Sequence, residues 1–150
     1  MPNSIVYSLL MLIAGIGIPV MAALNSGLGV KLGSSALATA VLFFVGFVIS
    51  SIYLFKMEGF PTHIFQRNIS WYFYMGGFLV AFYILSVTWV SPKFGVGNAV
   101  SFVLLGQLIA ISIIDHFGLF GAQQSTMDGS RALGLAIMVV GVFLVIKRAV

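Results

Sequence analysis

The chain contains no cysteine and only three acidic residues and two histidines among its 150 residues. Without cysteine it can form no disulfide, no thiolate metal site and no cysteine nucleophile. The few acids and histidines give no catalytic triad, no His-Glu-x-x-His pattern and no pair of carboxylates on one helix. The glycines lie within apolar segments, so no phosphate-cradling loop is present either. We therefore expect neither an enzyme nor a resident cofactor or metal ion.

Charge is scarce and apolar residues are abundant. Charged residues make up 7% of the chain and hydrophobic residues 61%, and the mean hydropathy is +1.16. A soluble domain of this length could not bury so much apolar surface. The seven basic residues give a formal charge of +4 but stand scattered between apolar blocks, without a stripe that could follow phosphates. We expect the chain to lie in a lipid bilayer and to bind no nucleic acid.

The apolar residues form blocks long enough to cross a membrane. About 20 apolar residues, rising 1.5 Å each, span a hydrocarbon core of roughly 30 Å. Five blocks meet this test, at about residues 5–28, 35–55, 70–90, 95–115 and 131–148. No Lys or Arg precedes the first block, which favours a mature helix over a cleaved signal peptide. The pattern predicts an all-α fold, with residues 1–150 forming one domain of five transmembrane helices.

Two polar residues in these blocks are candidates for contact with a substrate. Gln107 lies near the middle of the fourth block, and its amide suits a neutral or zwitterionic molecule, although a hydrogen bond between helices explains it equally well. Asn25 closes the first block just past Pro19 and is either a helix C-cap or part of a cavity mouth. We expect a midplane cavity bounded by the first four blocks, with Trp71 and Tyr83 as aromatic walls.

Asp115 and His116 end the fourth block and form the one acid–imidazole pair in the chain. Histidine titrates near neutrality and a carboxylate beside it favours its charged form, so the pair is a candidate gate or proton-responsive element. The alternative is a solvated helix end with structural hydrogen bonds. No acid lies inside the other blocks, which gives little support to a cation carrier driven by a buried carboxylate.

The fifth block carries a stripe that suits contact with a second subunit. Small residues let membrane helices approach closely, and a seven-residue repeat keeps them on one face. The stripe consists of Gly134, Met138, Gly141 and Val145. The alternative is that this face only packs against helices of its own protomer.

Several motifs together resemble the bacterial YdcZ-type family of the drug/metabolite transporter superfamily. They cover nearly the whole chain and are Pro19, Asn25-Ser26-Gly27-Leu28-Gly29, Gly46-Phe47, Trp71, Gly76-Gly77, Ser91-Pro92-Lys93-Phe94-Gly95, Gly106-Gln107-Leu108, Asp115-His116-Phe117-Gly118-Leu119-Phe120-Gly121, Arg131, Gly134 and Gly141. Many relatives carry a glutamine a few residues before the asparagine, whereas this chain has Met21-Ala22-Ala23. The resemblance implies a five-helix half-transporter that carries small metabolites or drugs across the bacterial inner membrane.

The basic residues are almost evenly divided between the two sides of the membrane. With the N-terminus inside, three lie in inner loops (Lys56, Arg67, Arg131) and four on the outer side (Lys31, Lys93, Lys147, Arg148). Such a count gives almost no bias for one orientation. An odd number of spans also puts the termini on opposite faces, so two oppositely inserted copies would form an inverted repeat of ten helices. We expect this antiparallel homodimer, or an inverted heterodimer with a paralogue.

These observations predict a secondary transporter that exports a small metabolite or drug-like molecule by alternating access as a dimer. The alternative is a structural or regulatory small membrane subunit without enzymatic activity. Transport by the purified, reconstituted protein would separate the two, as would a water-accessible cavity that reaches Gln107.

Overall fold

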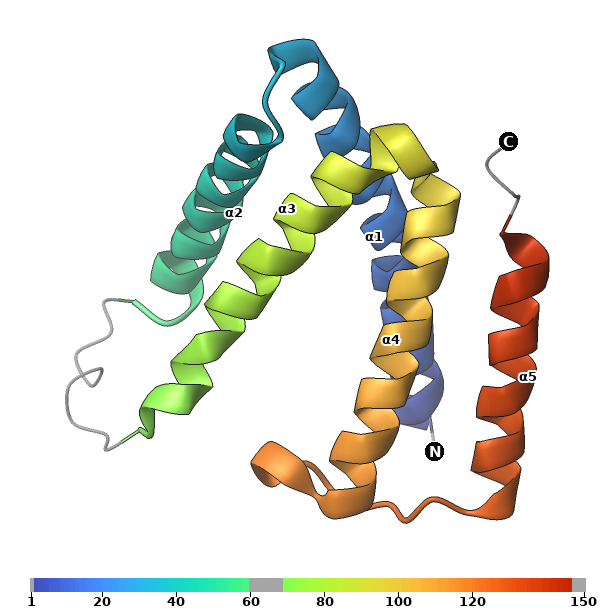
Figure 1. The fold of residues 1–150 in the computed structure, drawn as a ribbon. Helices are drawn as coiled ribbons and strands as arrows, with labels where there is room; N and C mark the ends of the chain where they lie inside the picture. The colour runs from blue at the N-terminus through green and yellow to red at the C-terminus, as the bar shows by residue number, and fades with distance from the viewer. Residues whose placement is uncertain (1, 60–68, 147–150) are drawn as a thin grey trace. The chain divides into compact units, whose positions relative to one another are not determined.

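The computed structural model describes residues 2–59 and 69–146, and the side chains of Pro2, Asn3 and Val145 lie outside that description. Its elements are α1 (Pro2–Leu32), α2 (Ser35–Met57), the 3-10 helix η1 (Trp71–Met75), α3 (Gly76–Phe94), α4 (Val96–Phe117), the 3-10 helix η2 (Leu119–Gly121) and α5 (Gly129–Val145) (Figure 1). The described residues include no strand, so the predicted all-α class is confirmed. The chain divides into two compact units, Met1–Lys93 and Phe94–Val150.

Four of these helical segments are long and apolar enough to cross a membrane: α1, α2, η1 with α3, and α4. Helix α5 is apolar but shorter, and its 17 residues correspond to roughly 26 Å, near the lower limit for a span. The end of the predicted fifth span, with Lys147 and Arg148, lies outside the described residues. The expectation of one five-helix domain stays a prediction.

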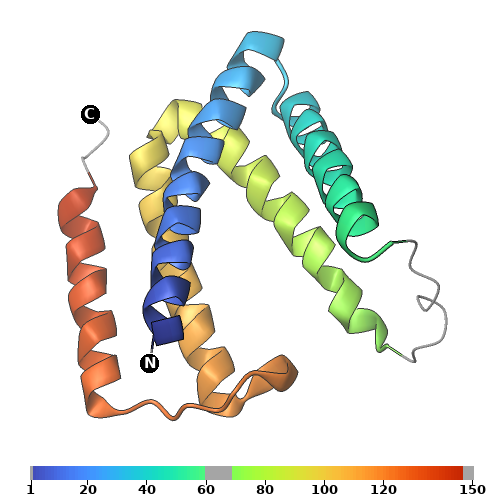
Figure 2. The same ribbon diagram turned by 180° about the vertical axis from the view of Figure 1, so that it is seen from behind.

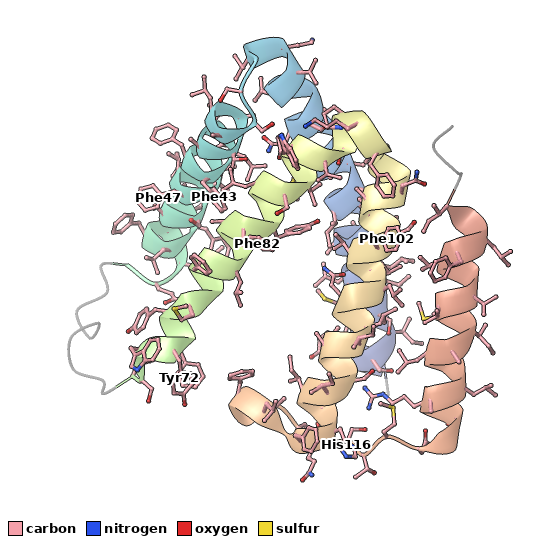
Figure 3. The ribbon with its side chains drawn as sticks, viewed as in Figure 1. Phe43, Phe47, Tyr72, Phe82, Phe102 and His116 are labelled. Carbon is pink, nitrogen blue, oxygen red and sulfur yellow. The ribbon has the colours of Figure 1, made fainter. Side chains whose placement is uncertain are left out.

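Most large apolar side chains are exposed on the isolated chain. Phe47 on α2 and Leu144 on α5 are 70% and 82% exposed, and Figure 3 shows Phe47 pointing away from its helix. A soluble monomer rarely leaves so much contiguous apolar surface in water. In a bilayer the same surface faces lipid, whereas the backbone polar groups are satisfied within each helix.

In the first unit, α1 and α2 are joined by a tight turn, which Figure 2 shows from behind. The Gly33 N–H donates to the Val30 carbonyl at 3.2 Å and the Ser34 N–H to the Gly29 carbonyl at 3.0 Å. With Gly33 at a φ of +66°, this is a Schellman C-cap. The Ser34 hydroxyl then accepts from the Leu37 N–H at 3.1 Å and caps α2.

The C-cap interpretation of Asn25 is wrong, because α1 continues past this residue to Leu32. Asparagine is a weak helix breaker, whereas Gly33 adopts the left-handed conformation at almost no cost and ends the helix there. Asn25 therefore lies inside α1, on its buried side.

Helix α3 turns one face toward the rest of the first unit. Its buried residues Ile84, Val87, Thr88 and Ser91 follow the helical spacing of three and four. Gly29 marks the closest approach, because a Cβ there would lie 3.1 Å from Thr88 Cγ2, 3.5 Å from Ser35 Cα and 3.7 Å from Ala38 Cβ. Three helices of this unit thus meet around a residue without a side chain.

In the second unit, α4 and α5 meet through the rings of Phe102 and Phe143. The Phe102 ring stacks on Phe94 with centroids 5.9 Å apart and meets the edge of Phe143 at 6.4 Å. Helix α4 ends at Gly118, whose φ of +60° is left-handed. Helix α5 begins after Asp128, whose carboxylate accepts from the Arg131 N–H at 2.8 Å and caps the helix.

Candidate functional site

The centre of the candidate site is a buried hydrogen bond between two helices. Asn25 on α1 donates from Nδ2 to Thr88 Oγ1 on α3 over 2.6 Å. The two residues are only 4% and 1% exposed. Ala22 and Ala38, both buried, keep the surroundings apolar. In such a medium the bond is electrostatically stronger than in water, and losing one partner would strand the other.

Three buried hydroxyl groups accompany this pair without a hydrogen-bond partner among the described residues. They belong to Thr39 on α2 and to Tyr83 and Ser91 on α3. An unsatisfied buried polar group costs about 1–3 kcal/mol, so each is a candidate contact for a ligand. We name Asn25, Thr39, Tyr83, Thr88 and Ser91 the inner polar cluster.

The residues of the cluster are distributed along their helices on either side of Thr88. Ser91 follows Thr88 by three residues and lies on the same buried face of α3. Thr39 follows Ala38, which faces Gly29 beside Thr88. Tyr83 precedes Thr88 by five residues, or about 7.5 Å of helix. None of the five side chains is charged at neutral pH, so the cluster suits a ligand that exchanges neutral hydrogen bonds.

Asn25 also opens onto a small apolar pocket between α1 and α2. The pocket encloses about 240 Å³, and Met21, Leu24, Leu28 and Leu42 line the rest of it. One amide among four aliphatic side chains is the usual composition of a site for a small, partly apolar molecule. Met21, the first residue of the Met21-Ala22-Ala23 segment, contributes an apolar side chain to this wall.

Two of the four predicted substrate contacts, Asn25 and Tyr83, carry buried polar atoms and are among the residues that we grouped in the inner polar cluster. Trp71 is 74% exposed on η1 and precedes Thr88 by 17 residues, roughly 25 Å of helix, so it does not join them. Gln107 belongs to the second unit, where it is exposed on α4 and makes no side-chain hydrogen bond to the described residues. Substrate contact by these four residues stays a prediction.

Sequence reasoning missed the hydroxyl residues of the cluster. Thr39, Thr88 and Ser91 are ordinary in apolar helices, because a hydroxyl can bond its own helix backbone. The available signal was the spacing of Ile84, Val87, Thr88 and Ser91, which places two hydroxyls on the face that also carries aliphatic residues. Only the tertiary structure pairs that face with Asn25.

Asp115 and His116 lie at the end of α4, and each is bonded to the loop that follows. Asp115 Oδ2 accepts from Arg131 Nη2 at 2.5 Å, and Arg131 Nη1 donates to Ser125 Oγ at 3.1 Å. His116 Nδ1 accepts from the Met127 N–H at 3.1 Å, and Figure 3 shows His116 beside the loop. An accepting Nδ1 places the proton of the neutral ring on Nε2.

The predicted acid–imidazole pair therefore has two separate partners in the structure. The carboxylate of Asp115 faces a guanidinium from the start of α5, and the imidazole of His116 faces a backbone N–H. Gln124 Nε2 adds a bond to the His116 carbonyl at 3.1 Å. These contacts fasten the segment between α4 and α5 at both of its ends. A gating or proton-responsive role for the pair stays a prediction.

The predicted dimer stripe lies on α5. Gly134 and Met138 are exposed and Gly141 is half-buried, whereas the side chain of Val145 lies outside the described residues. A Cβ at either glycine would meet no atom within 4 Å. Dimer contact through this stripe stays a prediction.

Apolar helices of transmembrane length, with uncharged polar groups buried between them, define a multi-pass membrane protein. A family model described as "Putative inner membrane exporter, YdcZ" matches residues 6–144, and the chain belongs to this family. The family is that of the predicted resemblance, and with the apolar helices its description supports a multi-pass protein of the inner membrane and a transporter's function. Comparisons with curated proteins and with solved structures give no match.

Proposed function

We propose that the protein exports a small, uncharged or zwitterionic metabolite or drug-like molecule, and that the inner polar cluster forms part of its substrate site. The observation that carries the proposal is the Asn25–Thr88 hydrogen bond, flanked by the partnerless hydroxyls of Thr39, Tyr83 and Ser91. Membrane exporters need polar contacts inside an apolar bundle, and polar groups at membrane depth that lack a partner are costly and often mark a substrate pathway.

Substrate binding follows from an exchange of hydrogen bonds. Without substrate, Asn25 and Thr88 satisfy each other and hold α1 against α3. A substrate amide or hydroxyl group takes over both partners and gains the free hydroxyls, so the bundle opens with little net loss of bonding. The aliphatic pocket beside Asn25 accepts the apolar part of the molecule. This exchange links substrate binding to helix separation, as alternating access requires.

The complete transporter is proposed to be a dimer of oppositely inserted copies. One chain supplies one five-helix half, and a second, inverted copy supplies the symmetry that lets a site open to either side. Gln107 on α4 and Trp71 on η1 are proposed as further substrate contacts. The stripe of Gly134, Met138, Gly141 and Val145 forms the seam between the copies. Asp115 and His116 act as a gate or proton-responsive pair, and the ion pair of Asp115 with Arg131 and the bond from the Met127 N–H to His116 hold them in place.

Transport by reconstituted protein tests the proposal. A thermal-shift screen of metabolites on the detergent-purified protein selects ligands, and uptake into liposomes then measures their transport. We expect Asn25→Ala and Thr88→Val to abolish the thermal shift and reduce transport at least tenfold. The matched control is Ser50→Ala, which removes an exposed hydroxyl bonded only to its own helix. Ligand binding and transport that are unchanged in both cluster variants would exclude the cluster as the site.

A further inference from the structure

A groove opens in the first unit beside the α1–α2 turn, apart from the inner polar cluster. One part encloses about 570 Å³ and includes Ala36, Leu85 and Ser86 in its lining. A second part of about 230 Å³ includes Pro92 and Lys93. Both parts share Gly33, Ser34, Ser35 and Trp89, so they form one continuous hollow, which we name the turn groove. Asn25 and Thr88 do not line it.

The turn groove is polar at one end and apolar at the other. Leu85 and Lys93 are eight residues apart on α3, so about 12 Å of helix separates the apolar end from the charged end. Lys93 lies next to the last residue of its helix, whereas Leu85 lies deeper in the span. A molecule with a head at the membrane surface and a chain toward the midplane matches this gradient.

The charged end carries a fixed cation. Lys93 Nζ lies 3.7 Å from the centroid of the Trp89 ring, whose face attracts the ammonium group. The ammonium N–H groups directed away from the ring remain able to donate to an anion. Lys93 is the one charged residue among those that line the groove, so the local field favours a negative group.

We propose that the turn groove binds an anionic phospholipid, with its headgroup phosphate on Lys93 and an acyl chain along Leu85 and Ala36. A lipid fits better than a soluble anion, because Trp89 and Leu85 are 59% and 41% exposed, and apolar side chains exposed on a helix of transmembrane length contact lipid. Trp89 also stands where interfacial aromatic residues anchor a span. The inference is independent of the transported substrate, since the groove and the cluster share no residue.

Trp89 itself reports on the occupant. In a Trp71→Phe background Trp89 is the single tryptophan, and its fluorescence is quenched by brominated lipid in contact with it. We compare vesicles in which either the phosphatidylglycerol or the phosphatidylcholine of a fixed mixture is brominated. One lysine near an anionic surface favours the anionic lipid about fivefold. We expect that preference in the background protein, its loss in Lys93→Gln and its retention in Lys93→Arg.

The matched control is Lys31→Gln, because Lys31 lies in the last turn of α1 near the same turn but does not line the groove. It should keep the preference. Equal quenching by the two lipids in the background protein would overturn the proposal, as would a preference that survives Lys93→Gln but not Lys31→Gln. A Lys93-dependent change in Trp89 emission on adding inorganic phosphate to pure phosphatidylcholine vesicles would instead assign the groove to a soluble anion.

A measurement on the chain with both tryptophans covers the case in which Trp71→Phe does not fold. Phosphatidylglycerol added to detergent-purified protein should raise the melting temperature of the unchanged chain and of Lys31→Gln, but not that of Lys93→Gln. An equal rise in all three would overturn the proposal.

Discussion

The side-chain amide of Asn25 donates to the hydroxyl of Thr88 over 2.6 Å, across 63 residues of sequence and between two helices. Both residues are buried, and neither amide nor hydroxyl can turn to water. The bond therefore fixes the position of α1 against α3. Aliphatic contacts alone would let the two helices slide past one another. It supplies both stability and the contact that a substrate must displace.

Removing one partner of this bond should lower the free energy of unfolding by more than the bond itself contributes. Asn25→Ala and Thr88→Val each strand a buried partner, so each should lower the free energy of unfolding by about 1–3 kcal/mol. The double variant should lose clearly less than the sum, because no stranded group then remains. Unfolding in mixed micelles with increasing denaturing detergent measures all three. Strictly additive losses would show that the two residues do not interact.

A side chain at position 29 should destabilise the protein, whereas one at position 27 in the same helix should not. A Cβ at position 29 would lie 3.1 Å from Thr88 Cγ2 and near the backbone of Ser35, so Gly29→Ala should destabilise by about 1–3 kcal/mol and Gly29→Val by more. The matched control is Gly27→Ala, whose Cβ meets no atom within 4 Å. Alanine is the better helix former, so the control should be neutral or stabilising by up to about 1 kcal/mol. Similar unfolding curves for Gly29→Ala and Gly27→Ala would refute the close packing.

Much of the fold could be predicted from the sequence, because membrane helices satisfy their own backbone. The apolar blocks predicted the helical class, and Asn25 was a candidate site residue because it is polar and lies at membrane depth. The first block was expected to end near residue 28, with Asn25 as a possible C-cap, whereas α1 continues to Leu32. The hydrogen bonds that decide it, from Gly33 to Val30 and from Ser34 to Gly29, depend on backbone geometry. Thr88 could not be found as a partner, since the rotation of α3 against α1 is a tertiary property.

The start of α5 should lose stability in acid. The Arg131 N–H and then the Ser130 hydroxyl donate to the Asp128 carboxylate and lower the pKa of that carboxyl below its ordinary value. A lowered pKa stabilises the folded chain above the ordinary value of about 4, and that contribution disappears as the pH falls through the folded-state pKa.

Comparing three chains at several pH values tests this cap. At neutral pH Asp128→Ala should melt at a lower temperature than the unchanged chain, and the difference should shrink as the carboxyl is protonated. Asp128→Asn keeps an oxygen acceptor for the Arg131 N–H and should show a smaller pH dependence. A difference in melting temperature between Asp128→Ala and the unchanged chain that stays constant down to strong acid would contradict the role of the Asp128 carboxylate as a cap.

The inverted dimer predicts that each loop is found on both sides of the membrane. Because the chain has no cysteine, a single introduced thiol labels one position only. Leu32→Cys at the end of α1 and Met57→Cys at the end of α2 flank the second helix, are both at exposed positions, and leave every charged residue in place. The unchanged charges matter, since the near-equal count of three and four basic residues is what leaves the orientation undecided.

An impermeant maleimide added to intact cells should therefore label about half of the copies at each position. Adding two arginines next to Met57 should move the label strongly to one position, and should abolish transport unless an oppositely biased copy is expressed beside it. Full labelling at one position and none at the other in the unaltered background would exclude the inverted homodimer and leave the heterodimer with a paralogue.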